Sequence, residues 1–263
     1  MSWASLINAQ VSRGGKPIDP IRLQFLGSGD AFGSGGRFQT CFLLAGMSDS
    51  VLIDCGTSSL IAMKRSGVDA SRIGWIILSH LHGDHFGGVP FLILDGQFNR
   101  RMRPLVIAGP PGVRDRVESA MEVLFPGSSR VSRRFVVEFV ELGDRVASTI
   151  GPATVTPFLV EHACGAPPYA LRIEYGGKMI AYSGDTEWSE NLVDAARETD
   201  LFVCEAYFFD KRIKYHLDYR TLLDQRERLG CRRLVLTHMS EDMLRRVKDL
   251  EVEYAEDGRI IEL

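Results

Sequence analysis

The chain has 263 residues, of which 45% are hydrophobic and 25% are charged, and its formal net charge is -3. This composition is typical of a globular protein, and the length is sufficient to bury a large core. Lysine and arginine are scattered along the chain without a basic excess, which argues against a nucleic-acid-binding surface. No apolar run approaches the ~20 residues that are needed to cross a bilayer, which argues against a membrane protein.

Along the chain, we expect residues 1–20 to form an N-terminal extension and residues 21–263 to form a single domain. Short apolar and alternating runs predict strands at Ile21–Leu26, Cys41–Ala45, Val51–Asp54, Trp75–Ser79, Leu105–Ala108, Phe135–Val140, Ala153–Val160, Ala170–Tyr175, Lys178–Ser183, Leu201–Cys204 and Arg233–Thr237. Helical periodicity predicts helices at Leu60–Ser66, Val113–Phe125, Asn191–Arg197, Tyr219–Leu229 and Glu241–Asp249. Many strands with interspersed helices favour two sheets covered by helices, in the α/β (α+β) class, over a strict βαβ array.

The histidines and one aspartate fall at the ends of predicted strands. Each of four strands is followed, at its carboxyl end, by a side chain that can bind a metal: His80, His162, Asp185 and His238. If these strand ends share one edge of the sheets, the four side chains converge. Taken alone, His162 or His238 would be interpreted as a satisfied core or loop histidine.

The segment His80-Leu81-His82-Gly83-Asp84-His85 concentrates three histidines and one aspartate in six residues. In an apolar setting such a cluster would cost several kcal/mol without a metal. Imidazole and carboxylate are ligands for Zn²⁺, Fe and Mn. The candidate ligands exceed the four of a structural zinc site and no cysteine is suitably spaced, so an open catalytic site is favoured.

A site of this kind can hold two cations roughly 3.5–4 Å apart, which polarise a substrate oxygen and hold a hydroxide ready as nucleophile. His80 and His82 alternate, so in an extended segment they point the same way. Asp84 and His85 continue into the next turn, where they can face a second metal. We therefore expect two divalent ions, with Zn as the first choice and Mn or Fe as alternatives.

The hexapeptide resembles the HxHxDH signature of the metallo-β-lactamase superfamily. Within that superfamily, Leu26–Phe32, Tyr182–Thr186 and Leu236–Ser240 resemble the branch of ribonuclease Z and the phosphonate-utilisation phosphodiesterases. The resemblance covers most of the chain from about Ile21 and implies a four-layer αβ/βα sandwich as a single domain.

By position, the resemblance also implies the ligands. One metal would be held by His80, His82 and His162, and the second by Asp84, His85 and His238, with Asp185 bridging the two. Asp54 matches the superfamily's acidic residue beside the site, where it would accept a hydrogen bond from a ligand histidine. The alternative for Asp54 is a turn-forming aspartate before Gly56.

In ribonuclease Z-like enzymes a glutamate orients a later histidine, which protonates the leaving oxygen. Cys204-Glu205-Ala206-Tyr207 resembles the first of these segments with both ends altered, and His216 is the candidate for the second. The alternative for His216 is an exposed loop histidine. We count Asp84, Glu205 and His216 as the catalytic residues.

The hairpin expected at Gly176 and Gly177 leaves no room for the long arm with which bacterial ribonuclease Z grips tRNA. The missing arm and the slightly acidic net charge together predict that tRNA is an unlikely partner. A small phosphodiester, such as a cyclic nucleotide, is the expected substrate. Arg37, Gln39 and Thr40, in a glycine-rich segment, are candidates to contact it, the alternative being a flexible surface loop.

Two other functions stay open on the same site. One is hydrolysis of a lactone, ester or amide, because two metals can polarise a carbonyl oxygen as well. The other is a non-catalytic metal-binding scaffold. The five cysteines include no CxxC pair, which favours a reducing, cytoplasmic setting. Proteins of the family that the chain resembles often form homodimers, so a homodimer is a possible assembly here.

Overall fold

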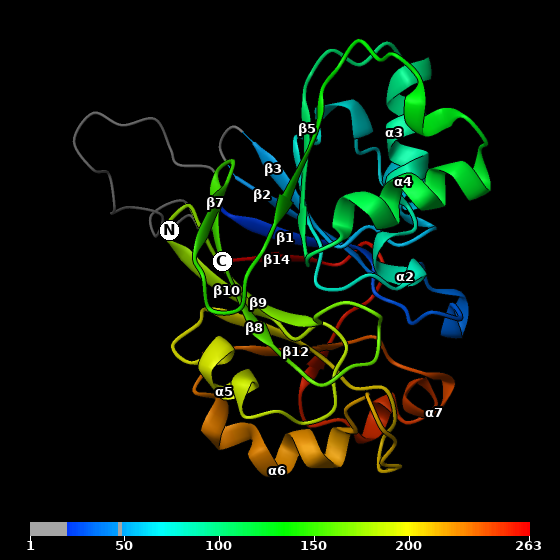
Figure 1. Cartoon of the computed structure of the whole chain (residues 1–263). Helices are drawn as coiled ribbons and strands as arrows, with labels where there is room; N and C mark the ends of the chain where they lie inside the picture. The colour runs from blue at the N-terminus through cyan, green and yellow to red at the C-terminus, as the bar shows by residue number, and fades with distance from the viewer. Residues whose placement is uncertain (1–19, 47–48) are drawn as a thin grey trace, which may run out of the picture.

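The computed structural model describes residues 20–46 and 49–263, so the predicted N-terminal extension lies almost wholly outside the described residues. Two mixed seven-stranded sheets stack face to face (Figure 1). In spatial order, the first sheet contains β14 (Ile260–Glu262), β1 (Arg22–Gly27), β2 (Cys41–Ala45), β3 (Ser50–Ile53), β4 (Trp75–Ile77), β5 (Leu105–Gly109) and β6 (Val137–Glu141). The second contains β13 (Glu253–Tyr254), β12 (Leu234–Thr237), β11 (Leu201–Glu205), β10 (Lys178–Tyr182), β9 (Tyr169–Tyr175), β8 (Ala153–Leu159) and β7 (Ser148–Ile150).

Helices cover the outer face of each sheet. The first sheet is covered by α1 (Ser59–Arg65), α2 (Gly83–Phe86), α3 (Val89–Phe98) and α4 (Val113–Leu124), and the second by α5 (Asn191–Ala196), α6 (Tyr219–Leu229) and α7 (Glu241–Leu244). Short 3₁₀ turns lie at Ser34–Gly36, Ala70–Arg72, Ser128–Arg130 and Val247–Asp249. The expected four-layer αβ/βα sandwich is confirmed.

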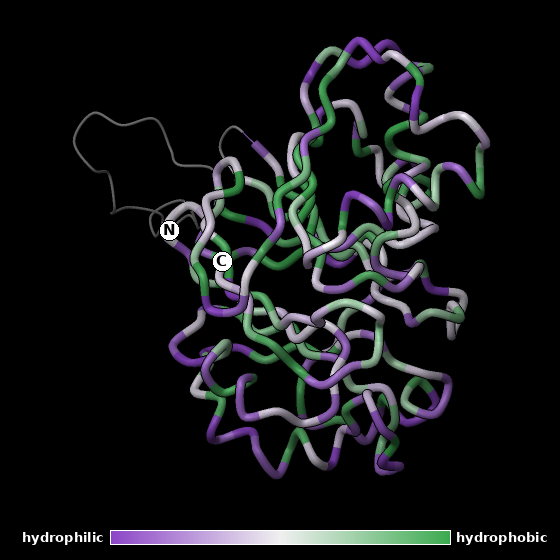
Figure 2. The backbone as a smooth tube through the Cα atoms, viewed as in Figure 1, coloured by the Kyte–Doolittle hydropathy of each residue, from purple (hydrophilic) through white to green (hydrophobic). Residues whose placement is uncertain are grey.

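Alternation along the strands builds three apolar layers. On β2, Phe42 and Leu44 face the second sheet, while Cys41 and Leu43 face the helices of the first. Successive side chains of a strand point to opposite faces, so each central strand contributes to two layers. Figure 2 shows apolar segments concentrated in the strands and more polar segments on the outer loops and on α6.

The two-glycine hairpin is present as expected. Tyr175 pairs with Lys178, and Gly176 and Gly177 have φ of 57° and 78°. Positive φ at both central residues is the requirement of a tight hairpin turn, which glycine meets without strain.

Several predicted elements need correction. The helix predicted at Glu241–Asp249 ends at Leu244, and a separate 3₁₀ turn follows at Val247–Asp249. Helices α2 and α3 and the three short strands β7, β13 and β14 are present without having been predicted. The other predicted elements are present, and none of their ends is shifted by more than two residues.

The topology brings the ends of several strands to one edge of the sandwich. Strands β10, β11 and β12 are parallel, and β8 runs in the same direction because two antiparallel pairings separate it from β10. In the first sheet, β3 and β4 are parallel. Side chains that follow these strands therefore meet at that edge, as expected.

No helix within residues 20–46 and 49–263 has both the length and the apolar character needed to cross a membrane.

Candidate metal centre

Seven histidine and aspartate side chains from both sheets gather at this edge. His80, His82 and His162 form one group whose possible ligand atoms lie within 4.8 Å of one another. A second group with the same spacing contains Asp84, His85, Asp185 and His238. The first group contains the three histidines that the resemblance assigns to one metal, and the second contains the three residues that it assigns to the other, together with Asp185.

Asp185 lies between the two groups. Its Oδ1 is 3.3 Å from His85 Nε2, and its Oδ2 is 3.2 Å from His238 Nε2. The same Oδ2 is 3.8 Å from His80 Nε2 and 4.0 Å from His162 Nε2. One carboxylate thus faces histidines of both groups, which is the geometry that a bridging ligand requires.

The donor atoms fit divalent cations. Ligand atoms ~2.0–2.2 Å from a tetrahedral Zn²⁺ are roughly 3.3–3.6 Å apart, close to the separations around Asp185. Three buried atoms of the cluster, His80 Nε2, His85 Nε2 and Asp185 Oδ1, have no hydrogen-bond partner among the described residues. Buried polar atoms are normally satisfied, so these atoms point to a ligand of opposite polarity, namely a cation.

Hydrogen bonds at the far side of two rings set which nitrogen faces the centre. His85 Nδ1 is 2.7 Å from Asp54 Oδ2, and His162 Nδ1 is 2.8 Å from the Tyr215 carbonyl oxygen. Both partners only accept, so each Nδ1 carries a proton, and each Nε2 is the nitrogen that faces the cluster. Neutral imidazole with a free Nε2 is the form that binds a metal.

Asp54 is fully buried and occupies the left-handed region, with φ of 57°. Besides His85, its carboxylate accepts the backbone N–H and the hydroxyl of Ser79, both at 2.8 Å. The strand end at Ile53 and the turn before Gly56 therefore hold this carboxylate behind the His85 ring. Sequence reasoning missed Ser79, although its place directly before His80 was a usable signal.

The charges of the cluster also favour a cation. Burial lowers the pKa of His80, of His82 and of His162, the last to about 4, so these rings are neutral at neutral pH. Burial opposes the charge of Asp185, but His238 and His85 outweigh it and hold the pKa of Asp185 well below its usual value. At His85, by contrast, burial opposes the charge, but Asp185, Asp84 and Asp54 outweigh it and raise the pKa well above its usual value, so the carboxylates of the cluster favour a positive charge at this position.

Glu205 and His216 meet beside the cluster. His216 Nδ1 is 3.0 Å from Glu205 Oε2, and the backbone N–H of Thr186 donates to Glu205 Oε1. Burial opposes the charge of His216, but the Glu205 carboxylate outweighs it and raises the pKa of His216 to about 9. The histidine also forms a group with His162 and Asp185.

Tyr207, the altered end of the Cys204–Tyr207 segment, was not predicted to take part in the site. Its ring stacks on His216, with centroids 4.7 Å apart and an interplanar angle of 29°. Tyr207 therefore holds the ring plane of His216 while Glu205 holds its Nδ1.

The three residues expected to contact substrate separate into two kinds. Thr40 is fully buried, with its hydroxyl 3.4 Å from His238 Nδ1, so the expectation that it touches substrate is corrected: it lies behind a cluster histidine. Arg37 and Gln39 are partly exposed and line a shallow pocket with Phe32. They stay candidates for substrate contact.

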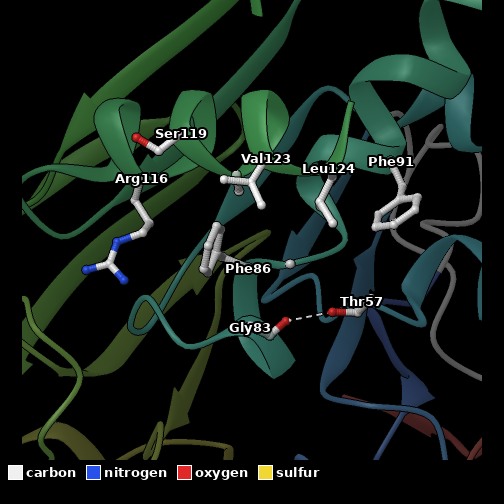
Figure 3. Close-up of a pocket in the computed structure, with 10 residues that line it drawn as sticks. Thr57, Gly83, Phe86, Phe91, Arg116, Ser119, Val123 and Leu124 are labelled. Atoms are coloured by element: carbon white, nitrogen blue, oxygen red, sulfur yellow. Dashed lines mark hydrogen bonds between the residues drawn. The ribbon is translucent and has the colours of Figure 1, made fainter. Parts of the chain in front are cut away.

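Two further pockets adjoin the cluster. An apolar pocket of about 390 Å³ lies between α2 and α4, lined by Phe86, Phe91, Val123 and Leu124, with Arg116 at its margin (Figure 3). The Gly83 carbonyl, which accepts the Thr57 hydroxyl at 3.1 Å, forms part of its wall. A polar pocket of about 330 Å³ has His216 in its wall.

The chain is similar to known proteins over most of its length. The family model described as Anti-Pycsar protein Apyc1 matches residues 21–261. A ribonuclease Z of Agathobacter rectalis is 25% identical over 261 residues, a match that covers 80% of this chain and 84% of that protein.

Solved structures share the fold. The metallo-β-lactamase fold protein YhfI of Bacillus subtilis has a TM-score of 0.75 and 21% identity, covering 93% of this chain and 100% of its own. The short form of human tRNase Z has a TM-score of 0.74 and 26% identity, with coverages of 92% and 98%. A diphosphatase of the PhnP family has a TM-score of 0.73 and 18% identity, with coverages of 92% and 98%.

These comparisons correct the expectation that tRNA is not a partner. That expectation depended on the short Gly176-Gly177 hairpin and on the net charge of -3. The relatives that match over most of their length are nevertheless named ribonuclease Z and tRNase Z. The match extends over 84% of the ribonuclease Z of Agathobacter rectalis, so the short hairpin and the net charge do not exclude tRNA.

Proposed function

The chain belongs to the Anti-Pycsar protein Apyc1 family, in the ribonuclease Z and PhnP-like branch of the metallo-β-lactamase superfamily, and we propose that it is a metal-dependent phosphodiesterase. The observation that carries the proposal is the pairing of the seven-residue cluster with the Glu205–His216 dyad at one edge. The cluster supplies a site for cations, and the dyad supplies a positioned proton donor. Hydrolysis of a phosphodiester needs both.

In this proposal, His80, His82 and His162 would hold one divalent cation, and Asp84, His85 and His238 a second, with Asp185 between them. Zn²⁺ is the first choice because imidazole and carboxylate are its usual ligands. Such cations supply Lewis-acid chemistry: they polarise a phosphoryl oxygen and make water a better nucleophile.

The chain's own residues have three tasks. Asp54 and the Tyr215 carbonyl hold ligand rings in the tautomer that leaves Nε2 free. Asp185 and Asp84 provide the negative charge that retains the cations. His216, held at Nδ1 by Glu205 at 3.0 Å, would donate its Nε2 proton to the departing oxygen. A positioned general acid contributes roughly 10²–10⁴-fold in rate.

A small phosphodiester such as a cyclic nucleotide is the first substrate class that we propose. The pockets beside the cluster support it, because each has a volume of about 330–390 Å³. Such volumes lie at the small-molecule end of ligand sites.

Cleavage of tRNA precursors is a second candidate. The observation that favours it is the likeness to ribonuclease Z of Agathobacter rectalis, which extends over 84% of that protein.

The proposed function is tested with a substrate panel. Purified protein would be loaded with Zn²⁺ or Mn²⁺ and assayed on bis(p-nitrophenyl) phosphate, 3′,5′-cyclic nucleotides, a tRNA precursor and a lactone. We expect phosphodiester cleavage that a chelator abolishes and added metal restores. Cleavage of lactones alone would point to the other hydrolase function, and metal binding without any turnover would point to a scaffold.

A further inference from the structure

The segment Leu26–Phe32 has a sequence motif to which the proposed metal site gives no task. Within it, Ser28 directly follows β1 and is fully buried. Its backbone N–H and its hydroxyl both donate to Oδ1 of Asp257, each at 2.9 Å. Oδ2 of the same carboxylate accepts the backbone N–H of Phe38 at 2.7 Å. Asp257, in the turn between β13 and β14, therefore holds both ends of the connection from β1 to β2.

Ser28 is also bonded to a residue of the candidate metal centre. Its carbonyl oxygen accepts the backbone N–H of His238 at 3.2 Å and the hydroxyl of Thr237 at 3.3 Å. The donors of Ser28 thus go to Asp257, while its acceptor goes to His238. Asp257 and His238 are therefore joined through one buried residue, although the three lie in different parts of the chain.

The backbone of His238 needs a restraint from outside its own segment. His238 directly follows β12 and has a φ of 56°, in the left-handed region, which is unfavourable for a residue with a Cβ atom. A residue keeps such a conformation only where the surrounding structure determines it. The hydrogen bond to the Ser28 carbonyl oxygen supplies this restraint at the N–H of His238.

The ring of His238 has a more distant partner than the rings of two other cluster histidines. His85 and His162 each place Nδ1 close to an oxygen that only accepts, at 2.7 and 2.8 Å. Nδ1 of His238 lies 3.4 Å from the Thr40 hydroxyl, its one hydrogen-bond partner within the part of the chain that the structure describes. The backbone restraint therefore matters more for His238 than for a ring that is held by a close acceptor.

The first group of candidate ligands is held by other parts of the chain. The Ser79 hydroxyl lies 3.1 Å from Nδ1 of His80, and the Tyr215 carbonyl oxygen lies 2.8 Å from Nδ1 of His162. Within residues 20–46 and 49–263, no hydrogen bond joins Asp257 to any of these four. A change at Asp257 should therefore act on the second group and leave the first in place.

We propose that Asp257 is a positioning residue for the second metal ion: through Ser28 it fixes the backbone of His238. Nε2 of His238 thereby stays 3.2 Å from Oδ2 of Asp185, the carboxylate that faces both groups. Asp257 itself does not touch the cluster. The inference rests on the proposed function, because it needs a site for two cations. It also gives the motif after β1 a task, namely to connect the C-terminal turn to the metal centre.

Asp257→Ala removes the acceptor of Ser28 and tests this connection. The full-length protein, freed of metal, would be titrated with Zn²⁺ against a chromophoric chelator to resolve two binding steps. We expect one step to weaken about tenfold, the lower end of the effect of removing a partner behind a ligand, and the other step to keep its wild-type affinity. Asp257→Asn, which keeps one acceptor oxygen, should show the same selective loss to a smaller extent. It carries the test if Asp257→Ala does not fold.

Asp69→Ala is the matched control. Asp69 also accepts the backbone N–H and the hydroxyl of one serine, Ser71, at 2.9 and 2.7 Å, but it lies at an exposed turn. Its removal should leave both Zn²⁺ steps unchanged. Equal weakening of both steps in the Asp257 variants would indicate a general loss of structure, and unchanged affinities would mean that Ser28 needs no support. Either result overturns the positioning role.

The titration separates this role from the proposed function, because it measures no turnover. If the wild type binds two Zn²⁺ ions but cleaves no phosphodiester, and Asp257→Ala weakens one step, the phosphodiesterase proposal fails and the positioning role stands. If the wild type cleaves phosphodiesters and the Asp257 variants bind both ions as tightly, the proposed function stands and the positioning role fails. Fewer than two ions bound by the wild type would overturn the two-cation site and the role of Asp257 with it.

Discussion

At the scale of single residues, buried carboxylates at the edge of the sandwich each serve a named neighbour. Asp54 accepts from His85 and Ser79, and Glu205 accepts from His216 and Thr186. A buried carboxylate is stable only with such donors, because burial penalises its charge. These partnerships suggest two variants that separate metal binding from proton donation.

Asp54→Asn should weaken metal binding. Asparagine keeps the shape and tolerates the positive φ of this position, but it has one acceptor oxygen where the carboxylate has two. We expect Zn²⁺ affinity about 10–100-fold lower, the usual effect of removing a partner behind a ligand histidine. A competition titration with a chromophoric chelator measures it. Asp69→Asn, at an exposed turn, is the control, and unchanged Zn²⁺ affinity in Asp54→Asn would contradict the role.

Glu205→Gln should slow turnover and spare the metal. Without the carboxylate, the His216 imidazolium is less favoured and its ring is held less firmly, so the general acid is impaired. We expect kcat on a phosphodiester with a poor leaving group to fall about 10²-fold. Elemental analysis should find the metal content of the wild type. Glu190→Gln, an exposed glutamate, should retain activity; a full rate in Glu205→Gln would remove the dyad from the mechanism.

At the scale of elements, the helices and strands with a clear hydrophobic period were predicted. A buried helix without such a period was missed. Helix α6 matches its predicted bounds at Tyr219–Leu229, because polar and apolar residues alternate with a helical period and Asp218 caps its start. Helix α3 at Val89–Phe98 was missed because its apolar residues lie all round the helix. A helix that is buried on several sides carries no amphipathic stripe.

The late short strands are held by ion pairs that sequence reasoning did not foresee. Glu253 on β13 pairs with Arg233 at 2.7 Å and also with Arg259. These partners lie just before β12 and β14, so one carboxylate links three chain segments. Hydrogen bonds from Arg233 are the main cause that lowers the pKa of Glu253.

This pairing predicts a pH-dependent contribution to stability. Because the folded pKa of Glu253 lies below the unfolded value, its contribution is fully present above the unfolded pKa and is lost as pH falls through the folded one. Glu253→Gln should therefore lower the free energy of unfolding at pH 7 by less than about 1 kcal/mol, since the group is partly exposed, and by almost nothing near pH 3. Urea unfolding at both pH values measures this.

The control for this pH prediction is Glu256→Gln, a nearby exposed glutamate. It should show no comparable difference between the two pH values. A loss that is the same at pH 3 and pH 7 in Glu253→Gln would mean that packing, and not charge, links these segments.

At the scale of the whole molecule, aromatic packing joins the two sheets. Phe42 of the first sheet contacts Phe25 and Tyr182 edge to face, with centroids 5.0 and 5.1 Å away. Tyr182 ends the strand that leads to Asp185, so the interface between the sheets also supports the edge where the cluster lies.

Phe42→Ala should destabilise the protein strongly. Phe42 is fully buried, and truncation of a buried phenylalanine costs about 3–5 kcal/mol through lost transfer energy and the cavity that it leaves. The free energy of unfolding in urea measures it. Phe98→Ala is the control because Phe98 is 82% exposed, and it should change stability by less than about 0.5 kcal/mol. A loss below about 1 kcal/mol in Phe42→Ala would mean that the inter-sheet layer repacks.

The sequence by itself determined the layered class of the fold and the candidate metal-binding residues. Strand alternation and helix periodicity are local properties, and a run such as His80 to His85 concentrates costly polar groups that need a common ligand. The placement of His162, Asp185 and His238 directly after strands indicated convergence, because the topology could bring those strand ends to one edge.

Only the tertiary structure decided what lies behind and beside the cluster. The burial of Thr40 against His238 joins residues that are far apart in the chain. The stacking of Tyr207 on His216 and the polar pocket with Arg212 bring together side chains whose spacing in the sequence did not indicate contact. Such contacts depend on how two sheets and their loops pack in three dimensions. No local period or spacing encodes them, because each side chain's partner is set by long-range packing and not by its neighbours in sequence.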